Sequence, residues 1–130
     1  MDLAGVRLVA LLAAIGFLAI AAFQVALAVG APLGRAAWGG AHERLPGRLR
    51  IGSAIAVVVW ALAALIVLAR GGLPVIALPP IVIDWGPWVL AGLSALGAIV
   101  NFASTSPWER FGWGPLALIL AGLCLVLAIS

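Results

Sequence analysis

The side chains best suited to chemistry lie in one glycine- and arginine-rich stretch, 30–50, which reads GAPLGRAAWGGAHERLPGRLR. Its His42 and Glu43 are of the types that act as general acid and base. Because adjacent residues in a loop rarely face one reacting atom, the pair does not by itself predict an enzyme. His42 is the only histidine, so no multi-histidine metal site can be built, and we expect no metal or cofactor.

The arginines and glycines of this stretch have two interpretations. Arginine forks with exposed glycine N–H groups can form a phosphate or headgroup site. Alternatively, a basic turn anchors helix ends to anionic lipids, at about 1 kcal/mol per arginine. The candidate ligand- or headgroup-binding residues here are Arg35, Trp38, His42, Glu43, Arg48 and Arg50.

A second polar cluster follows at 101–110. Ser106-Pro107-Trp108-Glu109 predicts a helix start, with Ser106 as N-cap, Pro107 in the first position and Glu109 in the third. Glu109 could instead pair with an arginine of the 30–50 stretch. The candidate binding residues of this cluster are Asn101, Glu109 and Arg110.

Two more candidates lie within apolar runs. Gln24 follows a stripe of small residues, and we expect it to hydrogen-bond Asn101 as the first helix packs on the small face of the third (Ala91, Ser94, Ala95 and Ala98). Trp60 falls at the centre of the second run. It either packs with its N–H on a neighbouring carbonyl or lines an internal pocket.

Four apolar runs must position these residues. Segments 8–29, 51–69, 88–103 and 115–129 hold no charged side chain, and about 20 apolar residues cross a bilayer as a helix. The chain is 66% apolar and 8% charged, against about 25% charged in soluble domains. The sequence therefore predicts an all-α polytopic membrane protein. We expect one domain, 1–130, forming a four-helix bundle with helices at about 6–29, 51–69, 86–104 and 113–129.

Arginine placement predicts the orientation. The connections 30–50 and 105–112 hold five arginines and the opposite side two, so the positive-inside rule places both connections in the cytoplasm and both termini outside a bacterial inner membrane. The first run is longer than the 7–15 apolar residues of a signal peptide, so we expect a retained helix. The lone Cys124 excludes an intramolecular disulfide.

The external connection, 70–85, is apolar but carries Pro74, Pro79 and Pro80, which disfavour a regular helix. It is either an apolar surface loop or a lid over the bundle. Asp84, just before Trp85 and Gly86, is expected to cap the third helix.

A short motif, P-x-x-R-x-x-W-G, occurs at 32–39 and again at 107–114, each time after an odd-numbered helix. It suggests two helix hairpins related as a parallel pseudo-repeat, as in some transporters.

The residues Gly30-Ala31-Pro32, Gly34-Arg35, Trp38-Gly39-Gly40, His42, Leu45-Pro46 and Leu49-Arg50 resemble the inner loop of a group of small bacterial four-helix membrane proteins. A segment resembling 101–110 precedes the last helix in that group. Leu33 and Arg35 stand where those proteins carry Trp and Glu, so a role of that acid does not carry over. The resemblance implies the four-helix architecture and no reaction.

Three function classes follow. The first is a non-catalytic lipid or small-ligand binder, or an accessory subunit of a membrane complex. The second is a small homodimeric transporter or permease, whose proton-coupled form is disfavoured because the first helix holds Gln24 and no acid. The third is a lipid-headgroup enzyme at the inner face. The partners expected are membrane lipids and a homo-oligomer or larger complex; nucleic acid is excluded, because the arginines flank membrane segments.

Overall fold

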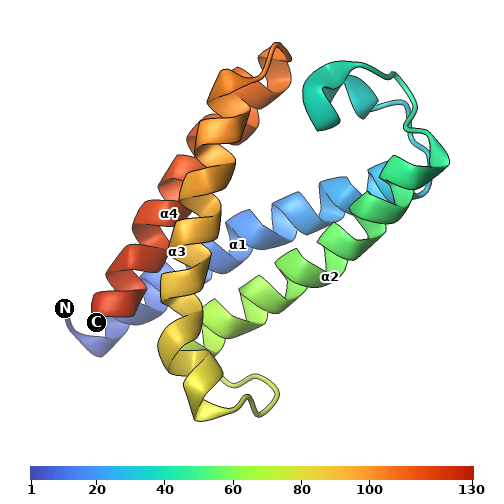
Figure 1. Cartoon of the computed structure of the whole chain (residues 1–130). Helices are drawn as coiled ribbons and strands as arrows, with labels where there is room; N and C mark the ends of the chain where they lie inside the picture. Colours follow the sequence, from blue (N-terminus) through green and yellow to red (C-terminus); the bar gives the residue numbers. More distant parts are fainter.

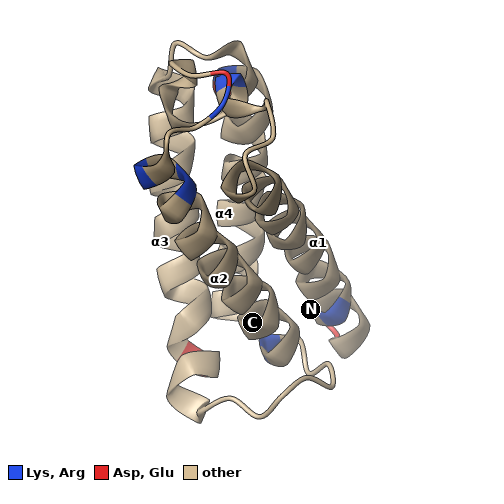
Figure 2. Cartoon of the chain, turned by 90° about the vertical axis from the view of Figure 1, so that its right-hand side faces the viewer, with Lys and Arg blue, Asp and Glu red and all other residues tan.

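The computed structural model describes residues 1–130 and confirms the all-α class. Four helical segments, each apolar and long enough to span a membrane, account for most of the chain, and the fourth (Glu109–Ile129) begins with a π turn. They are α1 (Leu3–Ala28), α2 (Gly47–Arg70), α3 (Pro80–Ala103) and α4 (Gly114–Ile129), and a π turn (η3, Glu109–Trp113) leads directly into α4. Charged residues gather at the two ends of the bundle (Figure 2), as expected of a multi-pass membrane protein.

The helices form two hairpins, α1 with α2 and α3 with α4 (Figure 1). The hairpins meet at the end that holds both termini and residues 71–79, which we name the closed end. They diverge toward the other end, the open end, where residues 29–46 form an arch containing the short turns η1 (Gly34–Ala36) and η2 (Trp38–Gly40).

Small residues allow the hairpins to meet at the closed end. Gly16 of α1 lies so close to Leu120 of α4 that an added Cβ would be 2.7 Å from a leucine methyl carbon, and a Cβ on Gly86 of α3 would be 2.5 Å from Ile66 of α2. Around these contacts lies the main core. Its buried members are Ala10, Ala13, Ala14, Phe17, Ala63, Ala64, Ile66, Val67, Leu90, Leu120, Cys124 and Leu127.

The predicted packing of α1 on α3 is wrong. The small residues of α1 are buried as expected, Ala10 and Ala14 among them, but α1 packs mainly along α2 and secondarily on α4. The reason is that a small-residue stripe marks a face that packs closely without selecting which helix packs there. The arch connects α1 directly to α2, so α2 is the helix that lies beside α1.

The start of α3 and the role of Asp84 also differ from expectation. The helix begins at Pro80, not near 86, with Pro79 as N-cap. A proline in the first turn needs no N–H partner, so the two prolines start the helix and only residues 71–79 form the connection. Asp84 therefore lies inside α3 and caps nothing; its Oδ1 is 3.3 Å from Nη1 of Arg70.

Arg70 joins the two hairpins at the closed end. From the last turn of α2, its Nε donates to the carbonyl of Leu127 at 3.0 Å and its Nη2 to that of Ala128 at 3.2 Å. These carbonyls belong to the last turn of α4, where few helical N–H groups are available to pair with them. The Arg70 side chain is 18% exposed and that of Asp84 is 66% exposed, so the carbonyl bonds matter more than the ion pair.

We expect Arg70→Gln to lower the free energy of unfolding by about 2 kcal/mol, since hydrogen bonds to a charged donor are lost. Asp84→Asn should cost less than about 1 kcal/mol, because the carboxylate is well solvated. Thermal unfolding of both variants in the same mild detergent tests this order. Equal losses would show that the ion pair, and not the capping of α4, holds this end.

Candidate functional site

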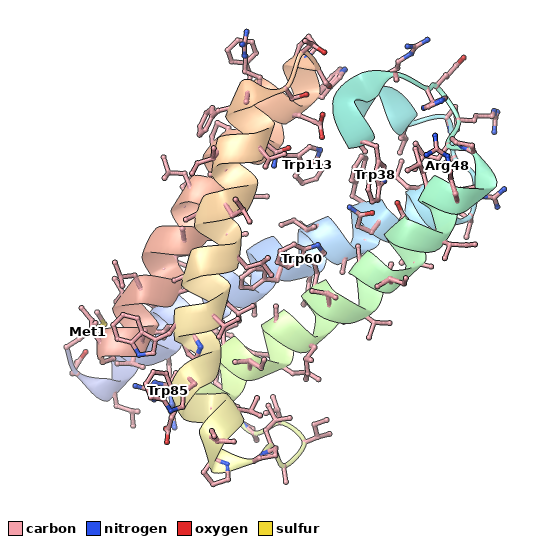
Figure 3. The ribbon with its side chains drawn as sticks, viewed as in Figure 1. Met1, Trp38, Arg48, Trp60, Trp85 and Trp113 are labelled. Carbon is pink, nitrogen blue, oxygen red and sulfur yellow. The ribbon has the colours of Figure 1, made fainter.

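A cavity of about 780 Å³ lies between the hairpins toward the open end. All four helices contribute to its wall, and the arch contributes Ala36 to Gly39 and His42. Figure 3 shows Trp38, Trp60 and Trp113 in the space between the hairpins, each from a different segment. The cavity lies beside the main core, and Leu120 belongs to both.

The cavity brings together most of the candidate residues from the two polar clusters and the apolar runs. Those that line it are Gln24, Trp38, His42, Arg48, Trp60, Asn101 and Glu109, whereas Arg35, Glu43, Arg50 and Arg110 lie outside it. His42 and Glu43 therefore do not face one point, and the acid–base pair of the enzyme hypothesis is not assembled by the arch.

Aromatic rings form much of the wall. Trp60 stacks on Phe17, with ring centroids 5.6 Å apart and planes 9° from parallel. Trp60 therefore both packs and lines the cavity, but its indole N–H does not make the hydrogen bond to a carbonyl that the first interpretation required. Sequence reasoning missed Phe23 of α1 and Trp113 of η3 as site residues; both line the cavity, and their ring centroids are 4.7 Å apart.

A second cavity, of about 650 Å³, lies beyond this ring pair. Phe23, Ala36 and Trp113 line both cavities and so form the partition between them. Arg35, which is outside the first cavity, lines the second together with Trp108.

Trp38 is held in the wall by backbone strain and a hydrogen bond. It is the only non-glycine residue with a positive φ, at 51°, and Gly39 and Gly40 follow at 82° and 77°. Its indole N–H donates to Oγ of the buried Ser53 at 3.1 Å. The left-handed conformation costs free energy for a bulky residue, so the turn depends on its contacts with the helices.

Glu109 fastens the arch to the other hairpin. Its Oε1 accepts from the backbone N–H of Gly39 at 3.0 Å and from the hydroxyl of Ser104 at 2.6 Å. Ser106 adds a second link, because its hydroxyl donates to the carbonyl of Arg35 at 2.6 Å. The expected contact between Glu109 and the 30–50 stretch is thus present, but its partner is a backbone amide and not an arginine.

The helix start at Ser106 follows the predicted pattern. Helical structure begins at Pro107, and the N–H of Glu109 lies 3.5 Å from Oγ of Ser106.

The two copies of the repeated motif P-x-x-R-x-x-W-G do not share one backbone conformation. Trp113 is helical with φ −70°, whereas Trp38 is left-handed, because Gly39 and Gly40 let the first copy turn back where the second continues as a helix.

The predicted hydrogen bond between Gln24 and Asn101 is absent. The side-chain amide of Asn101 donates to the carbonyl of Gly97, one turn earlier, at 2.7 Å. Oε1 of Gln24 is therefore without a partner in the chain. Two more buried polar atoms of cavity-lining residues also have none: Nδ1 of His42 and Oγ of Ser94. Because unpaired buried polar groups are costly, these atoms are available to a ligand or to water.

Most arginines satisfy backbone carbonyls at helix ends. At the end of α1, Arg44 donates to the carbonyl of Gly30 and Arg50 to that of Ala28. Arg110 donates to the carbonyl of Phe102 in α3, and Arg70 to carbonyls of α4. Arg35 donates to the carbonyls of Gly40 and Ala41 in the arch. The sequence interpretation as headgroup ligands overlooked this use. Helix C-termini leave carbonyls unpaired, and few other donors occur nearby in this chain.

Comparison with family models, with curated proteins and with solved structures finds no match to the chain.

Replacing Glu109 by alanine should loosen the arch, because the N–H of Gly39 loses its acceptor. We expect hydrogen–deuterium exchange in residues 34–41 to accelerate about tenfold, the equivalent of one charge-assisted hydrogen bond. Glu43→Ala removes an exposed carboxylate that accepts no hydrogen bond and is the matched control. Identical exchange in the two variants would mean that Glu109 does not hold the arch.

Proposed function

We propose that the chain is a non-catalytic membrane protein that binds a small amphipathic molecule, a lipid or a lipophilic metabolite, between its hairpins. The observation that carries the proposal is the 780 Å³ cavity, whose largely apolar wall includes unpaired polar atoms of Gln24, His42 and Ser94. Ligand sites are typically concave, of about 300–1,000 Å³, and mostly apolar with a few polar groups.

Packing at the closed end supports a binding site over a permeation pathway. Phe17, Leu120 and Leu127 are fully buried or nearly so in the core there, and Arg70 ties the ends of α2 and α4 together. A solute in the cavity would meet this core before it reached the closed end. In our proposal the open end faces the cytoplasm, because Arg35, Arg44, Arg48, Arg50 and Arg110 all lie there.

Gly97 offers a direct test. It lines the cavity, and a Cβ at this position would meet nothing within 4 Å. Gly97→Leu should therefore fill part of the cavity without clashing with the fold. Gly92→Leu is the matched control, since Gly92 is on the same helix and equally unobstructed but does not line the cavity.

Native mass spectrometry of the protein released from its own membrane is the measurement. We expect the unchanged chain and Gly92→Leu to carry a defined small molecule, and Gly97→Leu to lose most of it with an unchanged melting temperature. A bare wild-type chain, or an equal bound mass in Gly97→Leu, would refute binding in this cavity.

A further inference from the structure

Arg48 is the exception among the arginines of the open end. Arg35, Arg44, Arg50 and Arg110 each donate to backbone carbonyls. Arg48 makes no hydrogen bond and no ion pair, although it lines the cavity. The other charged residue of the wall, Glu109, already accepts two hydrogen bonds. Arg48 is therefore the only charged side chain of the wall that makes no hydrogen bond, whereas the carboxylate of Glu109 is held by two neutral donors.

The position of Arg48 in its helix gives no structural reason for the charge. It lies in the first turn of α2, which contains no acidic residue and no side-chain cap. A cation near a helix N-terminus is unfavourable, whereas an anion there is stabilised by the helix dipole. The charge of Arg48 and the partial positive charge at the N-terminus of α2 thus lie together beside the cavity.

The cavity opens sideways between α2 and α3. Phe23 of α1 and Trp113 of η3 form a ring pair in the wall, but no ring pair joins α2 to α3. There the wall includes Leu93 and Val100 of α3, which are nevertheless 38% and 61% exposed. Their exposure leaves the cavity open on this side, and Trp38 of the arch, another wall residue, is 46% exposed. Figure 1 views the molecule from this side.

Polarity changes along the cavity. Arg48 and His42 lie in the part formed by the arch and the start of α2, whereas Trp60, Leu93 and Leu120 line the part nearer the closed end. The apolar part also holds Ser94, a residue only 2% exposed whose hydroxyl has no partner. A charged group suits the first part and a hydrocarbon chain the second.

From these observations we infer that the ligand is an anionic amphiphile: one carboxylate or phosphate head against Arg48, and one hydrocarbon chain that enters between α2 and α3. The inference rests on the proposed binding function and adds the charge of the ligand and its route. The guanidinium provides charge-assisted hydrogen bonds to the head, and burial of the chain provides the apolar contribution.

The test uses dibromostearate and its methyl ester, which share a chain and differ in head charge. Each is titrated into the protein in phosphatidylcholine nanodiscs, and saturable bromine quenching of tryptophan fluorescence reports binding, since Trp60 and Trp113 line the cavity. We expect the carboxylate to bind about tenfold more tightly than the ester, as one charge-assisted contact implies.

Arg48→Gln should bring the two affinities within about twofold, with the ester unaffected. Arg7→Gln is the matched control, because Arg7 is also exposed and unpaired but lies at the closed end. It should keep the tenfold preference. Since Arg48 opposes the helix dipole, Arg48→Gln should melt no lower than the unchanged chain.

The outcomes separate the two proposals. If neither probe binds saturably, the binding function itself fails. If both bind equally to the unchanged chain, or if Arg48→Gln keeps the preference, the cavity binds amphiphiles and the anionic inference fails. Inorganic phosphate should not displace dibromostearate; displacement at similar concentration would show that the head alone is recognised and would overturn the requirement for a chain.

Discussion

The close approach of the two hairpins at one end depends on small residues that let the backbone of α1 come close to its neighbours. In α1, Ala10, Ala13, Ala14 and Gly16 are buried in the closed half, where backbones can approach because little side chain intervenes. The same helix then presents Phe23 and Gln24 to the cavity. Close contact at one end and aromatic rings toward the other leave the cavity between the hairpins.

The arch closes one end of this space. It is tied to α2 through Trp38 and Ser53, and to the second hairpin through Gly39 and Glu109. Both links start from a backbone in the left-handed region, where a tryptophan is strained and glycine is not. The strain is compensated by contacts that only the assembled hairpins provide, so the roof of the cavity and the packing of the helices depend on each other.

The need to satisfy backbone carbonyls explains the distribution of charge. A membrane helix must pair its polar backbone groups within the protein, and its last turn cannot do so alone. Arg44, Arg50, Arg70 and Arg110 serve this purpose. The chain has no lysine, and a guanidinium, which holds several donors in a fixed plane, can reach two carbonyls at once, as Arg70 does. Arg48 differs from these arginines because its guanidinium donates no hydrogen bond to a carbonyl.

The sequence alone determined the helical class, the number of membrane-spanning segments, the helix start at Ser106 and the polar stretches that hold most site residues. These are local properties: run length, hydropathy and capping are readable without knowledge of partners. Only the tertiary structure decided that α1 packs on α2, that Gln24 and Asn101 stay apart, that Asp84 meets Arg70, and that Arg48 alone remains unpaired beside the cavity. Those outcomes depend on which surfaces meet, and a pattern of small or charged residues marks a surface without naming its partner.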